Sequence, residues 1–266
     1  MKPWLHVKDM MGREVLLQAP PQRIVSVVPS QTELLYDLGL EEEVIGITKF
    51  CIHPRQWFRS KERVGGTKNL NLEKIAVLRP DLILANKEEN EKAQIEALQQ
   101  IAPVWLSDIA SLPQALQMIQ AVGDLCDRSR KATEIAAAVQ QNFEQLTLQS
   151  WPRRVAYAIW RNPWMWAGGG TFIDDLLHRM GWQNVLAEQT RYPEASLPQI
   201  HQLKPELILL SSEPYPFAEK HLSEVVAACP GARMLLVDGE MFSWYGSRLL
   251  QAPHYFEQLM QEAGNN

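Results

Sequence analysis

The feature that most constrains the fold of this 266-residue chain is an internal echo. Residues 72–84 (LEKIAVLRPDLIL) reappear as residues 197–209 (LPQIHQLKPELIL), an offset of 125 positions. Each copy predicts a short helix, a basic residue and a proline that end it, and then a strand that is apolar throughout. Strands of this kind fit a parallel sheet covered on both faces. A second echo, residues 32–39 against 174–181, pairs two helices that each end at a glycine. Two similar α/β lobes are therefore predicted.

Further strands are predicted at residues 24–28, 44–47, 104–106, 155–160 and 234–237. They alternate with helical segments, which favours βα units with right-handed crossovers. Apolar residues at helical spacing predict a helix over residues 112–122 and a second over 130–148, about 28 Å long. The predicted organisation is an N-terminal α/β lobe (1–108), a connecting helical backbone (109–149) and a C-terminal α/β lobe (150–266), with a ligand cleft between the lobes.

Composition and motifs exclude several classes of protein. The net charge is −5 and no dense Lys/Arg run occurs, so no nucleic-acid partner is expected. No apolar stretch reaches the roughly 18 residues that cross a bilayer. Residues 1–12 contain His6, Lys8 and Asp9 where a secretion signal needs an apolar core, so no signal peptide is predicted. Nucleophile-elbow, zinc-protease and nucleotide-binding glycine motifs are lacking, and enzyme activity is not expected.

Ligands of parallel α/β sheets bind beyond the carboxyl ends of the strands, so the loops there contain the candidate site residues. Residues 30–33 (SQTE) fit a helix-capping box, and they fit direct ligand contact as well. Cys51 and His53, two positions apart, suit a soft metal ion, and His53 alone suits an axial ligand of a chelated metal. The first-lobe candidates for ligand binding are Ser30, Gln31, Lys49, Phe50, His53, Lys68 and Lys87.

Three loops of the second lobe follow predicted strands and combine aromatic residues with a few charges. Such loops suit a broad, partly apolar ligand held by stacking and a few polar contacts. The mixture of acidic and basic residues favours a near-neutral, bulky ligand over a highly anionic one. The candidates here are Trp160, Arg161, Trp164, Glu213, Tyr215, Phe242, Trp244 and Tyr245.

Several motifs together resemble one protein family. Residues 23–33 (RIVSVVPSQTE), 71–75 (NLEKI) and 79–84 (RPDLIL), with the opening 9–13 (DMMGR), resemble the helical-backbone (class III) substrate-binding proteins of ABC importers, closest to the cobalamin-binding and ferric-siderophore receptors. The resemblance covers essentially the whole chain. It implies a monomer that holds a metal chelate, such as a corrinoid or an iron chelate, and needs no resident cofactor.

The resemblance also implies a location and a partner. Members of the family deliver their ligand to a membrane permease, which implies a periplasmic or cell-surface location; without a signal peptide, the cytoplasm remains an alternative. Glu73 matches one of two acidic residues with which the family docks its permease, whereas the internal offset places Pro198 at the other. The alternative function is a cytosolic metal-binding protein or enzyme on the same scaffold that uses Cys51 and His53.

Overall fold

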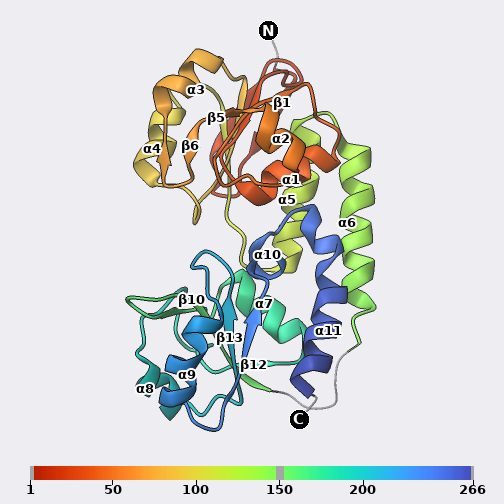
Figure 1. Ribbon diagram of the computed structural model, residues 1–266. Coiled ribbons are helices and arrows are strands. Elements are labelled where there is room, and N and C mark those ends of the chain that lie inside the picture. The colour runs from red at the N-terminus through yellow and green to blue at the C-terminus, as the bar shows by residue number, and fades with distance from the viewer. Residues whose placement is uncertain (1–2, 148–152, 265–266) are drawn as a thin grey trace. The chain divides into compact units, whose positions relative to one another are not determined.

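The computed structural model describes residues 3–147 and 153–264. The chain divides into two compact units, each built from several segments. The first comprises Met1–Asp108, Gln114–Gln140 and Tyr245–Arg248, and the second comprises Ile109–Pro113, Gln141–Trp244 and Leu249–Asn266. Each unit contains one main sheet (Figure 1).

The main sheet of the first unit is parallel throughout, with the strand order β5-β4-β3-β8-β9. Its buried strands are continuous apolar runs, as the sequence predicts. The strands are β3 (Ile24–Ser26), β4 (Val44–Ile47), β5 (Glu62–Arg63), β8 (Leu82–Asn86) and β9 (Val104–Ser107). Two antiparallel pairs accompany it: β1 (Leu5–Lys8) with β2 (Glu14–Leu17), and β6 (Gly65–Gly66) with β7 (Asn69–Leu70).

Apolar side chains of helices α3 and α4 pack on the first sheet. Ile75 of α3 and Ile95 and Leu98 of α4 join the core cluster over the strand residues Val25 and Ile83. That burial removes apolar surface from water and is the main driving force for the layering. The helices of this part are α1 (Pro29–Asp37), α2 (Arg55–Ser60), α3 (Leu72–Leu78) and α4 (Lys92–Leu98).

Two longer helices, α5 (Leu112–Leu125) and α6 (Ser129–Glu144), lie mostly in the first unit, and both extend into the second. The prediction of a helix over 130–148 is correct in place but too long, because α6 ends at Glu144; Leu148 lies outside the described residues. At 16 residues, α6 is about 24 Å long.

The sheet of the second unit has the order β11-β10-β13-β14, and β12 pairs with β10. Strands β10, β13 and β14 are parallel, whereas β11 is antiparallel to β10. In Figure 1, α8 and α9 lie on one side of this sheet and α7 and α11 on the other. The elements are β10 (Arg154–Trp160), β11 (Met165–Trp166), α7 (Phe172–Arg179), β12 (Gln183–Asn184), α8 (Leu197–Gln202), β13 (Leu207–Ser211), α9 (Leu222–Ala228), β14 (Arg233–Val237), α10 (Gly239–Ser243) and α11 (Ala252–Gly264), with short 3-10 turns at Glu219–His221 and Ser247–Leu250.

The internal echo is confirmed in the backbone. Helix α3 leads into β8 and helix α8 leads into β13, and each pair is separated by a basic residue in the left-handed conformation, Arg79 (φ 48°) or Lys204 (φ 51°). The following proline cannot continue a helix, so the chain turns directly into the buried strand. Gly39 (φ 79°) and Gly181 (φ 74°) close the second pair of helices in the same way.

No helix among the described residues is long and apolar enough to cross a membrane. All three cysteines are buried and free.

Candidate functional site

The carboxyl edge of the first sheet is lined by polar side chains that the loops after β3, β8 and β9 bring together. Gln31 Nε2 donates to Ser107 Oγ at 2.6 Å, and Asn86 Nδ2 donates to the same oxygen at 3.0 Å. Gln31, Asn86 and Ser107 are all at most 1% exposed. The edge is therefore built from buried, neutral amide and hydroxyl groups that hydrogen-bond to one another.

The predicted capping box at residues 30–33 is wrong. The N-cap of α1 is Val28, Pro29 occupies the first turn, and no side chain caps the helix. Pro29 has the fixed φ that suits the first helical position, so the helix begins before Ser30 rather than at it. The Glu33 carboxylate instead binds Arg248, with Nη2 to Oε1 at 2.6 Å and Nε to Oε2 at 3.0 Å.

In the loop after β4, neighbouring hydroxyl groups hold the Cys51 thiol. Cys51 is fully buried, and its Sγ contacts the hydroxyls of Thr32 at 3.1 Å and Thr48 at 3.2 Å. Burial raises the pKa of the Cys51 thiol to about 11, so the metal-free thiol stays protonated near neutral pH. Within residues 3–147 and 153–264, no group of three or more His, Cys, Asp or Glu side chains could hold a metal ion. His53 is half-buried in the same loop.

The other predicted residues of this loop are exposed. Phe50 is 51% exposed, and Lys49 Nζ lies 5.1 Å from the centre of its ring. A cation over an aromatic face is weakly attracted by the ring. Phe50 therefore offers exposed apolar surface in this loop, together with its neighbour Ile52.

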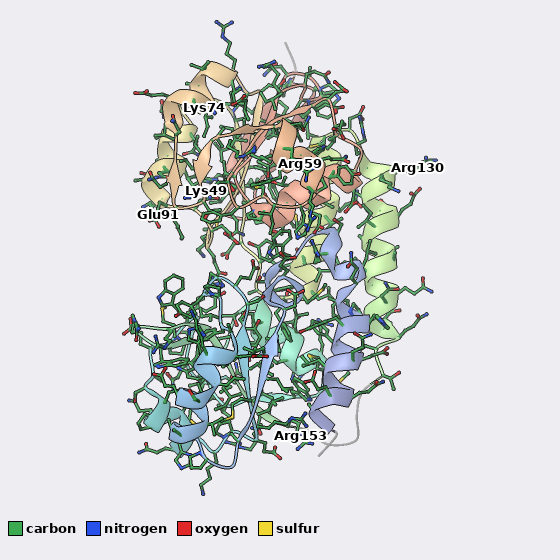
Figure 2. The ribbon with its side chains drawn as sticks, viewed as in Figure 1. Lys49, Arg59, Lys74, Glu91, Arg130 and Arg153 are labelled. Carbon is green, nitrogen blue, oxygen red and sulfur yellow. The ribbon has the colours of Figure 1, made fainter. Side chains whose placement is uncertain are left out.

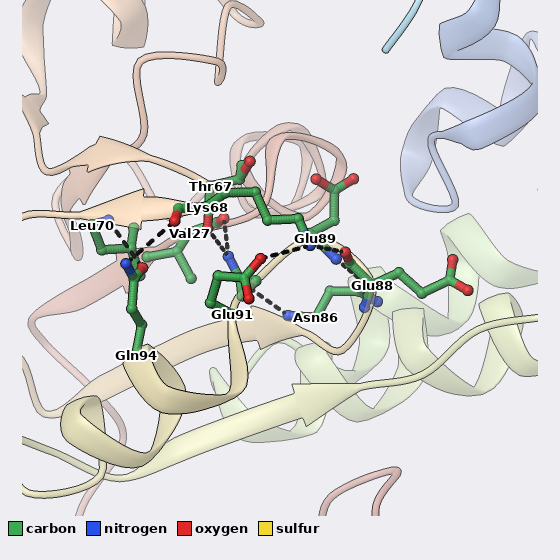
Figure 3. A network of polar contacts seen from close by, with 10 residues as sticks. Val27, Thr67, Lys68, Leu70, Asn86, Glu88, Glu89, Glu91 and Gln94 are labelled. Atoms are coloured by element: carbon green, nitrogen blue, oxygen red, sulfur yellow. Dashed lines mark hydrogen bonds and ion pairs between the residues drawn. The ribbon is translucent and has the colours of Figure 1, made fainter. Parts of the chain in front are cut away.

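Hydrogen bonds fix the loop after β8 (Figure 3). Asn90 Oδ1 accepts from the Asn86 N–H at 2.9 Å, and Asn86 Oδ1 accepts from the N–H groups of Glu88 and Glu89. Lys68 Nζ donates to the Glu88 carbonyl oxygen at 2.6 Å. The loop is thus ordered by the side chains of two buried asparagines, Asn86 and Asn90.

Both predicted lysines of this region have acidic partners. Lys87 Nζ lies 2.6 Å from Asp108 Oδ2, and Lys68 Nζ lies 3.5 Å from Glu91 Oε1. These pairs are partly or largely exposed and contribute little to stability. The carboxylates nevertheless balance the charges of Lys68 and Lys87, two of the lysines predicted to bind the ligand.

The carboxyl edge of the second sheet carries a cluster of aromatic side chains. Trp160 packs edge-on against Tyr215, with ring centres 5.6 Å apart, and Tyr215 contacts Phe217 at 4.7 Å. Trp164 stacks on Phe217 at 5.5 Å and on Trp166 at 5.6 Å. Trp160 is 39% exposed, whereas Trp166 is fully buried. The cluster joins the core on one side and presents aromatic surface on the other.

Arg161 lies beside this cluster and is paired with Glu224, with Nη2 to Oε2 at 2.8 Å. Glu213 lies in the loop after β13, and its Oε1 accepts from Ser243 Oγ at 2.8 Å and from Trp244 Nε1 at 2.7 Å. Burial raises the pKa of Glu213, and the nearby Glu240 carboxylate raises it further. Glu213 thus ties the loop after β13 to helix α10.

Three predicted aromatic residues are buried. Phe242 is fully buried and packs against Tyr157 at 5.0 Å and Phe256 at 4.8 Å. Trp244 and Tyr245 are each 5% exposed; Trp244 belongs to the second unit and Tyr245 to the first. The sequence of these loops does not distinguish aromatic rings that pack into the core from rings that are exposed.

A cavity of about 360 Å³ lies in the second unit, at a place that no sequence motif indicates. It runs along α7, past Thr171, Asp174 and His178, to Asn184 of β12. Asp174 Oδ1 accepts from Asn184 Nδ2 at 2.8 Å. The lining combines polar side chains with apolar ones such as Trp182 and Ala187, and Asn184 already occupies one oxygen of the Asp174 carboxylate.

The predicted docking residue Glu73 is exposed in the first turn of α3. Its neighbour Lys74, labelled in Figure 2, pairs with Glu62 at 2.7 Å. Pro198 is exposed in the first turn of α8, where the Ser196–Gln199 capping box begins the helix. The two echo helices are therefore alike in backbone and different in charge.

Comparison with known proteins identifies the family. The family model described as "Periplasmic binding protein" matches residues 24–228. A vitamin B12-binding protein of Photorhabdus laumondii is 27% identical over 94% of this chain and 90% of its own, and an ABC transporter substrate-binding lipoprotein of Bacillus subtilis is 26% identical over 76% and 68%. The crystal structure of the periplasmic vitamin B12-binding protein of Vibrio cholerae shares the fold, with a TM-score of 0.76, 22% identity, and coverage of 93% of this chain and 99% of that one. Because the family model spans well over half of the sequence, the chain belongs to the periplasmic binding protein family.

Proposed function

We propose that this protein is the substrate-binding component of an ABC importer and that it binds a metal chelate of the corrinoid or iron-chelate type. The aromatic cluster at the carboxyl edge of the second sheet is the observation that carries this proposal. Stacked rings suit a broad, partly apolar ligand. The relatives support the same class, since those from Photorhabdus laumondii and Vibrio cholerae are vitamin B12-binding proteins.

The charges favour a near-neutral chelate. Of the four predicted binding cations, Lys68, Lys87 and Arg161 each face a carboxylate of their own unit, whereas Lys49 lies over the Phe50 ring. A highly anionic siderophore would have to compete with those carboxylates. A corrinoid would instead stack on the exposed ring of Trp160 in the second unit.

Titration of the purified protein tests the proposal. Cyanocobalamin, haem, a ferric hydroxamate and zinc are added separately, and tryptophan fluorescence is followed. We expect saturable binding of a chelate at micromolar concentration or below and no stoichiometric zinc response. If no chelate binds, the proposed function is wrong.

Two tryptophans of equal exposure provide a matched control. Trp160 and Trp4 are both 39% exposed, but Trp4 lies outside the candidate loops, just before β1. Trp160→Ala should weaken chelate binding by about tenfold or more, because one base-sized stacking contact is worth roughly 1–3 kcal/mol. Trp4→Ala should leave the affinity unchanged. Equal effects of both variants would contradict the assignment.

We further propose that the protein acts as a monomer in the periplasm or at the cell surface and delivers its ligand to a permease through Glu73. The exposure of Glu73 on α3 supports this role. Glu73→Gln should reduce ligand delivery to permease vesicles without changing ligand affinity. Glu194→Gln, an exposed acidic control from the second unit, should leave delivery intact. Loss of delivery in both variants would argue against a single acidic anchor.

A further inference from the structure

The first turn of α1 contains buried polar atoms without partners. Ser30 is 3% exposed and Gln31 is fully buried, yet Ser30 Oγ and Gln31 Oε1 form no hydrogen bond with any described residue. A buried polar atom without a partner costs free energy, and native proteins retain few of them. Their retention in neighbouring residues of one helical turn requires an explanation.

The same turn is the uncapped start of a nine-residue helix. The first N–H groups of a helix lack intrahelical acceptors, and Val28 supplies no side-chain cap here. The helix dipole adds partial positive charge at this end. The turn thus offers main-chain donors, the Ser30 hydroxyl and the Gln31 acceptor oxygen, at the carboxyl edge of the first sheet.

A second segment packs on this turn and adds another such atom. A Cβ on Gly246 would lie 2.6 Å from the Ser30 carbonyl oxygen, so the backbone at Gly246 approaches α1 closely. Arg248 holds this segment through Glu33. Between them, Ser247 is 3% exposed, and across the described chain its Oγ likewise has no partner.

We infer that the first turn of α1 is a subsite for a carboxamide arm of the bound chelate. A carboxamide carries both an acceptor oxygen and N–H donors. Its oxygen takes the main-chain and hydroxyl donors of the turn, and its N–H pairs with Gln31 Oε1. A carboxylate would leave Gln31 Oε1 unpaired and repelled. The inference rests on the proposed function and specifies which side groups the ligand carries.

The key test is Ser30→Ala, because the subsite predicts opposite effects on stability and on binding. Without ligand, removal of an unpartnered buried hydroxyl should leave the melting temperature unchanged or raise it. With dicyanocobinamide, whose arms are carboxamides, the variant should bind about fivefold more weakly, the factor expected for one hydrogen bond. A merely structural hydroxyl cannot produce this combination.

Ser26→Ala is the matched control. Ser26 is also fully buried, but its Oγ donates to the Val28 carbonyl oxygen at 3.2 Å and accepts from Thr32 Oγ1 at 2.8 Å. This variant should lower the melting temperature and leave the affinity for dicyanocobinamide unchanged. Cobyrinic acid, in which carboxylates replace the amides, should bind the wild type more weakly than dicyanocobinamide, because a carboxylate has no N–H to pair with Gln31 Oε1.

The outcomes separate the inference from the proposed function. If the wild type binds no chelate at all, the proposed function fails, and the subsite fails with it. If the wild type binds dicyanocobinamide and Ser30→Ala binds it equally well, only the subsite is refuted. A lower melting temperature for ligand-free Ser30→Ala would also refute the subsite, because it would reveal a structural partner such as a bound water. Tighter binding of cobyrinic acid would overturn the choice of carboxamide.

Discussion

The ion pair between Glu33 and Arg248 provides the sharpest test of the electrostatics in the first unit. The side chains are only 14% and 10% exposed, and two hydrogen bonds join them. Burial raises the pKa of Glu33 even though the Arg248 guanidinium and the nearby His53 lower it. Arg248→Met keeps most of the apolar stem and removes the charge. The Glu33 carboxylate then remains buried without its main partner.

We expect Arg248→Met to lower the free energy of unfolding by about 3 kcal/mol at about pH 8, the lower end of the range for breaking a buried pair, because both groups retain slight exposure. The loss should shrink as the pH falls. Without Arg248 the pKa of Glu33 rises further, so the folded state binds a proton that the unfolded state releases. Stability from this proton is present at low pH and is lost as the pH rises through the folded-state pKa.

Urea denaturation between about pH 5 and about pH 8, followed by tryptophan fluorescence, measures the effect. The double variant Glu33→Gln/Arg248→Met should recover stability at high pH, because a neutral amide replaces the stranded carboxylate. Arg130→Met, which removes an arginine that is 94% exposed on α6 (Figure 2), should leave the midpoint unchanged. A loss below about 1 kcal/mol for Arg248→Met, or one independent of pH, would refute the reasoning.

Three further predictions follow from single sites. Glu213→Gln keeps the acceptor oxygen but cannot ionise. Because burial raises the pKa of Glu213, the stability of the wild type should fall as the pH rises through that pKa. The urea midpoint of the variant should not change with pH. Cys51 should resist a maleimide near neutral pH until the protein unfolds, as mass spectrometry would show, because burial raises its pKa to about 11; labelling of the folded protein would contradict its burial. Gly169→Ala should lower the free energy of unfolding, measured by urea denaturation, by about 3 kcal/mol, because the new Cβ would lie 2.0 Å from the Ala187 carbonyl oxygen. Gly170→Ala should lower it by about 1 kcal/mol, because Gly170 has a φ of +70° but open space around it. Equal losses would contradict this account.

The repeated architecture was predictable because its signals are local. A basic residue and a proline after Leu78 and after Leu203 end one helix and start one strand within a few positions, and the structure places Arg79 and Lys204 in the same left-handed conformation. Continuous apolar strands then require cover on both faces. These rules depend on neighbouring residues alone, so they apply equally well in both copies.

The site was less predictable because burial and partners depend on distant segments. The Ser30 to Glu33 spacing fits a capping box, but Arg248, 215 positions further along, binds Glu33 instead. Phe242 looks like a loop aromatic, yet it packs on Phe256 from the next long helix. Such contacts between distant segments have no periodic signature in the sequence.

The two echo units share a backbone plan but carry different chemistry at the corresponding edges of their sheets. Gln31 and Asn86 make the first edge an array of neutral donors and acceptors, whereas Trp160 and Trp164 make the second edge aromatic. The binding free energy gained by burying aromatic surface scales with the contact area, so it differs little between ligands of similar size. Buried hydrogen-bonding groups, in contrast, reject a ligand that leaves them unpaired. Substitutions at the second edge should therefore weaken all chelates of similar area together, and substitutions at the first edge should change which side arms are accepted.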